Sequence, residues 1–171
     1  NNVLATDIGD YVSYDAILEV FYVDNDTGST DAVNRVFSYT KGIAIVFSSR
    51  SIGLLLNFVG DPANHSVELL NSQIGLVGRK AVVMVGGDVL FLSEPGGIYR
   101  IAQAFEQRQQ VLPLPITDPI QPLIDRIHWR VANGAVAASL GEYVYFAVPI
   151  DGSTYNNCVI VYNGATGKLE G

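Results

Sequence analysis

Residues 87–93 have the sequence GDVLFLS, a glycine followed by a short run of mainly apolar residues. Two other runs share this design, GIAIVFS at residues 42–48 and GEYVYFA at residues 141–147. A second strand-like run follows each of the three in turn, at residues 51–56, 97–101 and 157–162. Aromatic and β-branched residues favour strands, and short turn segments between such runs are typical of hairpins. The sequence therefore predicts three similar β-hairpins.

Two more strand candidates precede each hairpin, so each unit contains about four strands. These candidates are residues 17–23 and 35–39, residues 67–70 and 81–85, and residues 129–131 and 136–140. The glycines that begin the three hairpin runs are 45 and 54 residues apart. Four strands that recur at about this period are typical of a β-propeller blade, because one small sheet cannot bury its faces alone.

We therefore expect a mainly β fold with about three propeller-like blades, at residues 11–60, 65–103 and 128–171 of a single β-rich region over residues 1–171. Propellers close with four to eight blades. Three blades would leave two faces uncovered, so we expect the region to be part of a larger propeller and of a longer polypeptide. A sandwich or an irregular barrel is the alternative fold, because β-hairpins of any fold share the same alternation of side chains and can look alike.

A short helix is predicted within an insertion at residues 104–128, between the second and third units. Asp118 can cap it, Pro119 suits its first position, and Gln121 stands at the capping-box position. Apolar residues follow at helical spacing, namely Ile120, Leu123, Ile124 and Ile127. We expect this apolar face to lie on a sheet. Pro113 and Pro115 precede it in a connector that cannot join a central strand.

Composition limits the possible classes of function. The chain has 171 residues, of which 49% are hydrophobic and 16% charged, so a disordered segment is excluded and some apolar surface is expected to face a partner. No apolar run is long enough to span a bilayer. The net charge is -7, and seven of the acids lie in residues 1–31, which hold no Lys or Arg. Specific nucleic-acid binding is not expected, because no basic stripe is present.

Acidic side chains gather in one stretch, residues 24–31. Asp24, Asp26 and Asp31 could provide oxygen ligands for calcium on a loop that contains Gly28. The spacing differs from that of an EF-hand, and Asp, Asn, Gly and Ser also form ordinary turns. A weak calcium site and a solvated hairpin tip both remain open, and no cofactor is expected.

No residue set predicts catalysis. Asp125 and His128 are three residues apart, so they could share a helix face as an oriented base, or be a solvated acid and a helix-end histidine. Cys158, the single cysteine, lies in an apolar strand and is expected to be a small core residue rather than a nucleophile. We therefore expect a protein that is not an enzyme.

Five stretches carry a resemblance to a known group of proteins: AVVMVGGDVLFLS at residues 81–93, GIY at 97–99, DPIQPLIDRI at 118–127, YVYFAVP at 143–149 and DGSTYNN at 151–157. Together they resemble virion proteins of tailed bacteriophages. The likeness is to the propeller-like tail and neck components of short-tailed phages, which include the tail nozzle (tail tubular B) and packaged-DNA-stabilising proteins. It covers about residues 40–171 and departs at Leu169, where such hairpins often carry Trp.

The resemblance implies a non-enzymatic structural protein of the virion tail, made in the host cytoplasm during assembly. Its expected partners are copies of itself in an oligomeric ring, other tail and neck proteins, DNA that passes without specific binding, and the host surface. A carbohydrate-binding or carbohydrate-cleaving propeller is the first alternative. A bacterial repeat scaffold that binds protein partners is the second.

Overall fold

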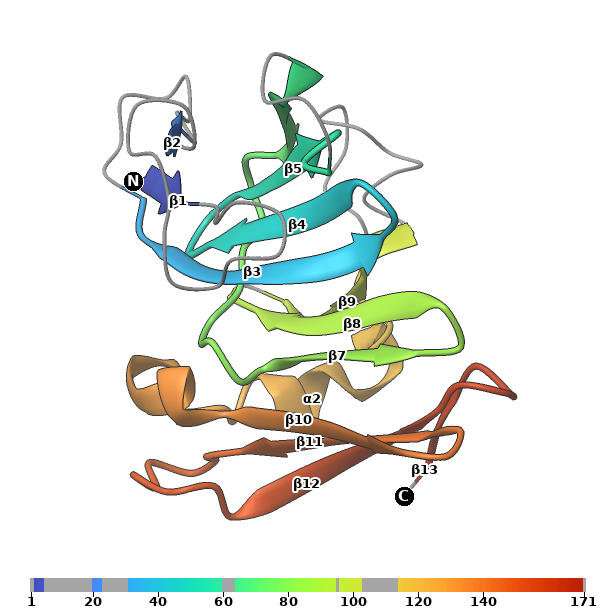
Figure 1. The fold of residues 1–171 in the computed structure, drawn as a ribbon. Coiled ribbons are helices and arrows are strands. Elements are labelled where there is room, and N and C mark those ends of the chain that lie inside the picture. The colour runs from blue at the N-terminus through green and yellow to red at the C-terminus, as the bar shows by residue number, and fades with distance from the viewer. Residues whose placement is uncertain are drawn as a thin grey trace.

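Three antiparallel sheets make up most of the fold. The computed structural model describes residues 2–4, 20–22, 31–59, 64–94, 96–102 and 114–170. In chain order, the sheets lie one beyond the next (Figure 1). The first contains β3 (Val33–Thr40), β4 (Ile43–Ser48), β5 (Ile52–Leu56) and β6 (Ser66–Asn71). The second contains β7 (Val82–Val85), β8 (Asp88–Ser93) and β9 (Gly97–Arg100). The third contains β10 (Val136–Leu140), β11 (Tyr143–Val148), β12 (Cys158–Asn163) and β13 (Lys168–Glu170).

The three predicted hairpins are confirmed. β4 pairs with β5, β8 with β9 and β11 with β12, all antiparallel. The first two strands of the second sheet are joined by Gly86 and Gly87, with φ of 57° and 82°, a turn that favours glycine at both positions. Each sheet is a simple meander, in which consecutive strands are neighbours.

The first sheet gains a strand that the sequence analysis assigned to the second unit. Residues 67–70 lie in β6, which pairs with β5 through Leu55 and Val67. The assignment to the second unit was wrong because β6 completes the first sheet as the neighbour of β5, and residues 72–81 separate it from β7; strands that follow one another in sequence often pair. Of the candidate strand at residues 17–23, the structure describes β2 (Val20–Tyr22), which pairs with β1 (Asn2–Leu4) and not with the first sheet.

The second sheet has no fourth strand. Residues 114–117, which precede the predicted helix, cover its edge at β9 instead. Ile116 donates a backbone hydrogen bond to the Ile98 carbonyl at 2.8 Å. The Ile98 N–H in turn donates to the Thr117 hydroxyl at 3.1 Å. Pro115, which has no N–H to donate, stands just before this contact, and the pairing goes no further.

The predicted helix is present but shorter than expected. It consists of a 3-10 turn, η2 (Asp118–Ile120), and a single α-turn, α2 (Gln121–Ile124). Thr117, not Asp118, occupies the N-cap, and its side chain makes no capping bond because its hydroxyl contacts β9. Ile124 is buried and lies against Gly97 of β9, so the apolar face does pack on a sheet.

The helix ends at Ile124 because the residues after it pair with the loop after β11. His128 donates to the Pro149 carbonyl at 2.9 Å, and Asp151 donates to the Arg126 carbonyl at 3.0 Å. The predicted strand at residues 129–131 was wrong, since those residues begin a second 3-10 helix, η3 (Trp129–Gly134). A run of three residues is too short to show a period, and here it reverses the chain before β10.

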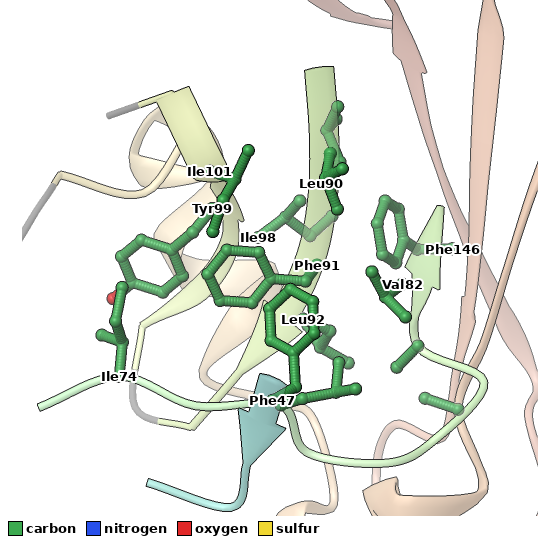
Figure 2. Close-up of a cluster of buried hydrophobic side chains, with 14 of the residues drawn as sticks. Phe47, Ile74, Val82, Leu90, Phe91, Leu92, Ile98, Tyr99, Ile101 and Phe146 are labelled. Carbon is green, nitrogen blue, oxygen red and sulfur yellow. The ribbon is translucent and has the colours of Figure 1, made fainter. Parts of the chain in front are cut away.

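One hydrophobic core joins all three sheets. Phe47 of the first sheet and Phe91 of the second have ring centroids 5.1 Å apart, and Phe91 lies 5.9 Å from Tyr99. Figure 2 shows this cluster, with Phe146 of the third sheet beside Val82. All five side chains are buried. Burial raises the pKa of the Tyr99 phenol.

The first strands of successive sheets lie near one another. Asn34 and Arg35 of β3 donate to the carbonyls of Leu76 and Arg79, in the connector that leads to β7. β7 contacts β10, and the Ala137 N–H donates to the Lys80 carbonyl at 2.8 Å. The sheets therefore approach one another along their first strands. In the described part of the chain, no helix is long and apolar enough to cross a membrane.

Candidate functional site

One face of the third sheet is apolar and exposed. In the register of β10 and β11, Val136 pairs with Ala147 and Leu140 with Tyr143. In the register of β11 and β12, Tyr145 pairs with Val161 and Ala147 with Val159. Directly paired residues lie on the same side of a sheet. We call this side the outer face and define it by six side chains, Val136, Leu140, Tyr143, Tyr145, Val159 and Val161.

The opposite side of the third sheet belongs to the core. Val144, Phe146 and Val148 alternate with the outer-face residues along β11 and are fully buried. On the outer face, by contrast, 74% of Leu140, 56% of Val159 and 42% of Tyr143 remain exposed. Four exposed large hydrophobic side chains, counting Val136, thus lie on one sheet face. Contiguous apolar surface of this kind marks interaction sites.

The corresponding positions in the other two sheets are buried. The fifth residue is Phe47 in β4, Leu92 in β8 and Ala147 in β11. These three residues therefore occupy equivalent places in the three sheets. Phe47 contacts Phe91 of the second sheet, and Leu92 is fully buried in the common core. Ala147, on the same side of the third sheet as the outer-face residues, is only half-buried. The third sheet therefore exposes the side that the first two sheets bury.

A second feature is a groove of about 620 Å³ where turns of all three sheets meet. Its lining comes from the β4–β5 turn, the connector before β7, the end of β8 and η3. The lining residues are Ser49, Arg50, Ser72, Gln73, Leu76, Val77, Glu94, Trp129 and Asn133.

Two glycines allow the connector to form the centre of this groove. A Cβ on Gly75 would lie 2.4 Å from the Arg50 backbone nitrogen, and a Cβ on Gly78 would lie 2.3 Å from the Asn133 carbonyl oxygen. Between them, Leu76 donates to the Ser48 carbonyl at 2.8 Å and Val77 donates to the Leu92 carbonyl at 3.0 Å. The backbone of the connector, residues 72–81, is thus hydrogen-bonded to β4 and β8 and lies close to η3.

Asp31 fixes the turn that carries Arg50. Its carboxylate accepts hydrogen bonds from the Arg50 N–H at 3.0 Å and from the Ser51 hydroxyl at 2.8 Å. This explains one of the three calcium candidates as a group that stabilises a turn. Asp24 and Asp26 lie outside the described residues, and among those described no group of three His, Cys, Asp or Glu could hold a metal ion.

The other candidates for chemistry are not brought together. Nδ1 of His128 lies 3.0 Å from the Ser153 carbonyl, while Asp125 accepts from Gln121. Cys158 is half-buried in β12 and packs against the core. Arg126 and Asp151 form a two-point ion pair at the surface, at 2.9 and 2.6 Å, which lowers the pKa of the Asp151 carboxyl.

Sequence reasoning missed the groove because its residues come from four separate segments with no shared motif. Two signals could have pointed to it. Trp129 is the only tryptophan and lies outside the repeated hairpins, and Gly75 and Gly78 stand close together in a segment between strands. Neither indicates a ligand by itself.

Comparison with known proteins adds no family to these observations. No known family model and no curated protein matches this sequence.

Proposed function

We propose that this protein is a non-enzymatic structural component of a bacteriophage virion, in the tail nozzle or neck. In this proposal the three sheets are blades of a propeller-like unit, and the subunits assemble into a ring for DNA passage or host attachment. The observation that carries the proposal is the exposed outer face, together with the burial of the equivalent positions in the first two sheets.

The stacking of the sheets supports a propeller-like arrangement. Successive four-stranded or three-stranded meanders lie in chain order and approach along their first strands, β3, β7 and β10. Each stacked sheet buries one side of the sheet before it. A further sheet from a neighbouring virion subunit is the partner that continues this pattern on the outer face.

The energetics favour a covered outer face. Burying one Val or Leu side chain contributes about 1.5–3 kcal/mol relative to leaving it exposed. Leu140 and Val159 are more than half exposed, so much of this free energy is still to be gained on assembly. Lys168 and Glu170 pair with Asn163 and Val161, so these two exposed charges lie on the same side of the sheet as the outer face, along its edge strand β13.

The charge of the chain is compatible with a role in DNA passage. Its net charge of -7 provides no general attraction for a phosphate backbone. An acidic or neutral channel wall would let DNA move past without holding it.

The proposal is tested by the native mass of the protein and by its presence in purified virus particles. We expect a large assembly and co-sedimentation with particles, and loss of assembly in the double variant Leu140→Lys and Val159→Lys. The matched control is Val59→Lys, because Val59 is 55% exposed but lies outside the outer face. A wild-type monomer of 18.4 kDa that is absent from virus particles would contradict the proposal.

A further inference from the structure

We propose that the groove binds a neutral oligosaccharide, with the Trp129 ring as the surface on which a sugar ring stacks. This site is separate from the outer face and goes beyond the structural role proposed above. It would give the protein a means of contacting a glycan surface.

The mixture of side chains in the groove fits a sugar. Trp129 and Val77 are partly exposed and provide apolar surface in the lining. Hydroxyl and amide groups in the lining provide both donors and acceptors, from Ser72, Gln73 and Asn133. A sugar ring has an apolar C–H face and a rim of hydroxyl groups, so it can use both kinds of surface at once. A purely apolar ligand would leave the polar groups without partners.

The charges in the groove favour a neutral ligand. Arg50 and Glu94 are the two charged residues of the lining, and their charges cancel. In the part of the chain that the structure describes, neither side chain has a hydrogen bond or ion pair, so both are free to bind hydroxyl groups. A phosphate or nucleic-acid site would instead require several basic residues.

Hydrogen bonds within the protein hold the backbone around the groove in place. Asp31 holds the turn of Arg50, and backbone hydrogen bonds from Leu76 and Val77 hold the connector against β4 and β8. A preorganised site loses less conformational entropy on binding than a flexible one. Its volume, about 620 Å³, lies within the usual range for small-ligand sites.

Trp129 makes the test direct, because the chain has one tryptophan and its fluorescence reports on the groove alone. The probes are maltoheptaose, cellohexaose, chitohexaose and dextran, each titrated against the wild-type protein. We expect at least one of them to change the fluorescence and to protect Trp129 from acrylamide quenching. Failure of all four up to about 10 mM, a concentration that would detect even weak binding, would overturn the proposal.

Two variants locate the binding. Arg50→Ala and Gln73→Ala should each weaken it about fivefold, the effect of losing one ordinary hydrogen bond. Arg130→Ala is the matched control, since Arg130 is exposed on η3 next to Trp129 but does not line the groove. Equal affinities for all four proteins would also overturn the proposal, because the sugar would then bind elsewhere.

Discussion

Replacing Gly78 by alanine should destabilise the protein by inserting one methyl group between two backbone segments. The new Cβ would lie 2.3 Å from the Asn133 carbonyl oxygen and 2.8 Å from two further backbone atoms of Asn133. An ordinary contact requires 3.4 Å or more, so η3 must move by about 1 Å. Since both sides of the contact are backbone, no side-chain rotation can relieve it.

The loss of stability is expected because moving η3 also moves residues of the hydrophobic core. Ala132 within it and Ala135 just after it are fully buried, so the displacement disturbs the core as well as the groove. Overpacking of this kind costs about 1–3 kcal/mol. For a chain of this size, each kcal/mol lowers the Tm by about 2–4 °C.

Thermal unfolding, monitored by circular dichroism and by Trp129 fluorescence, measures the effect. Gly134→Ala is the matched control, because nothing lies within 4 Å of a Cβ there and Gly134 has no positive φ. Alanine at such a position leaves stability unchanged or raises it slightly, because it lowers the conformational entropy of the unfolded chain. Equal Tm values for Gly78→Ala and Gly134→Ala would refute the reasoning.

Three further predictions concern other residues. Phe91→Ala should lower the free energy of unfolding by about 3–5 kcal/mol in urea titrations, because the ring is fully buried between Phe47 and Tyr99. Asp31→Ala should lower it by about 1–3 kcal/mol, since the part-buried Arg50 N–H and the buried Ser51 hydroxyl lose this acceptor. The folded-state pKa of Asp151 is lowered by its ion pair, so its contribution to stability is present above its ordinary value of 3.8 and lost as pH falls through the lowered pKa. The difference in Tm between wild type and Asp151→Asn should therefore shrink on acidification below that value.

The hairpins could be predicted because their signal is local. A short apolar run after a turn glycine predicts a strand, as in β8, where the residues from Val89 to Leu92 are buried on both sides of the sheet. The sheet to which β6 belongs could not be predicted from its own sequence. Ser66–Asn71 could pair with the strand before it or after it, and only the spatial position of β5 decides.

The short helix illustrates how tertiary contacts override a helical pattern. Ile127 has the spacing of a fourth apolar helix residue, yet it forms an isolated bridge with Ile150. The pairing of residues 126–128 with the loop after β11 satisfies backbone groups that a longer helix would have satisfied. A partner more than twenty residues away is not visible in the local pattern.

The outer face and the groove are built from different elements, and this separates the two proposals experimentally. Every groove-lining residue precedes β10, whereas every outer-face residue lies in β10, β11 or β12. The Leu140→Lys and Val159→Lys double variant should therefore abolish assembly and leave the oligosaccharide affinity within about twofold of wild type, because distant substitutions with no shared contacts act independently. The test is titration of Trp129 fluorescence in the double variant, with its fold checked by circular dichroism. A folded variant that lost sugar binding together with assembly would show that the groove depends on the neighbouring subunit, and the two sites would have to be treated as one.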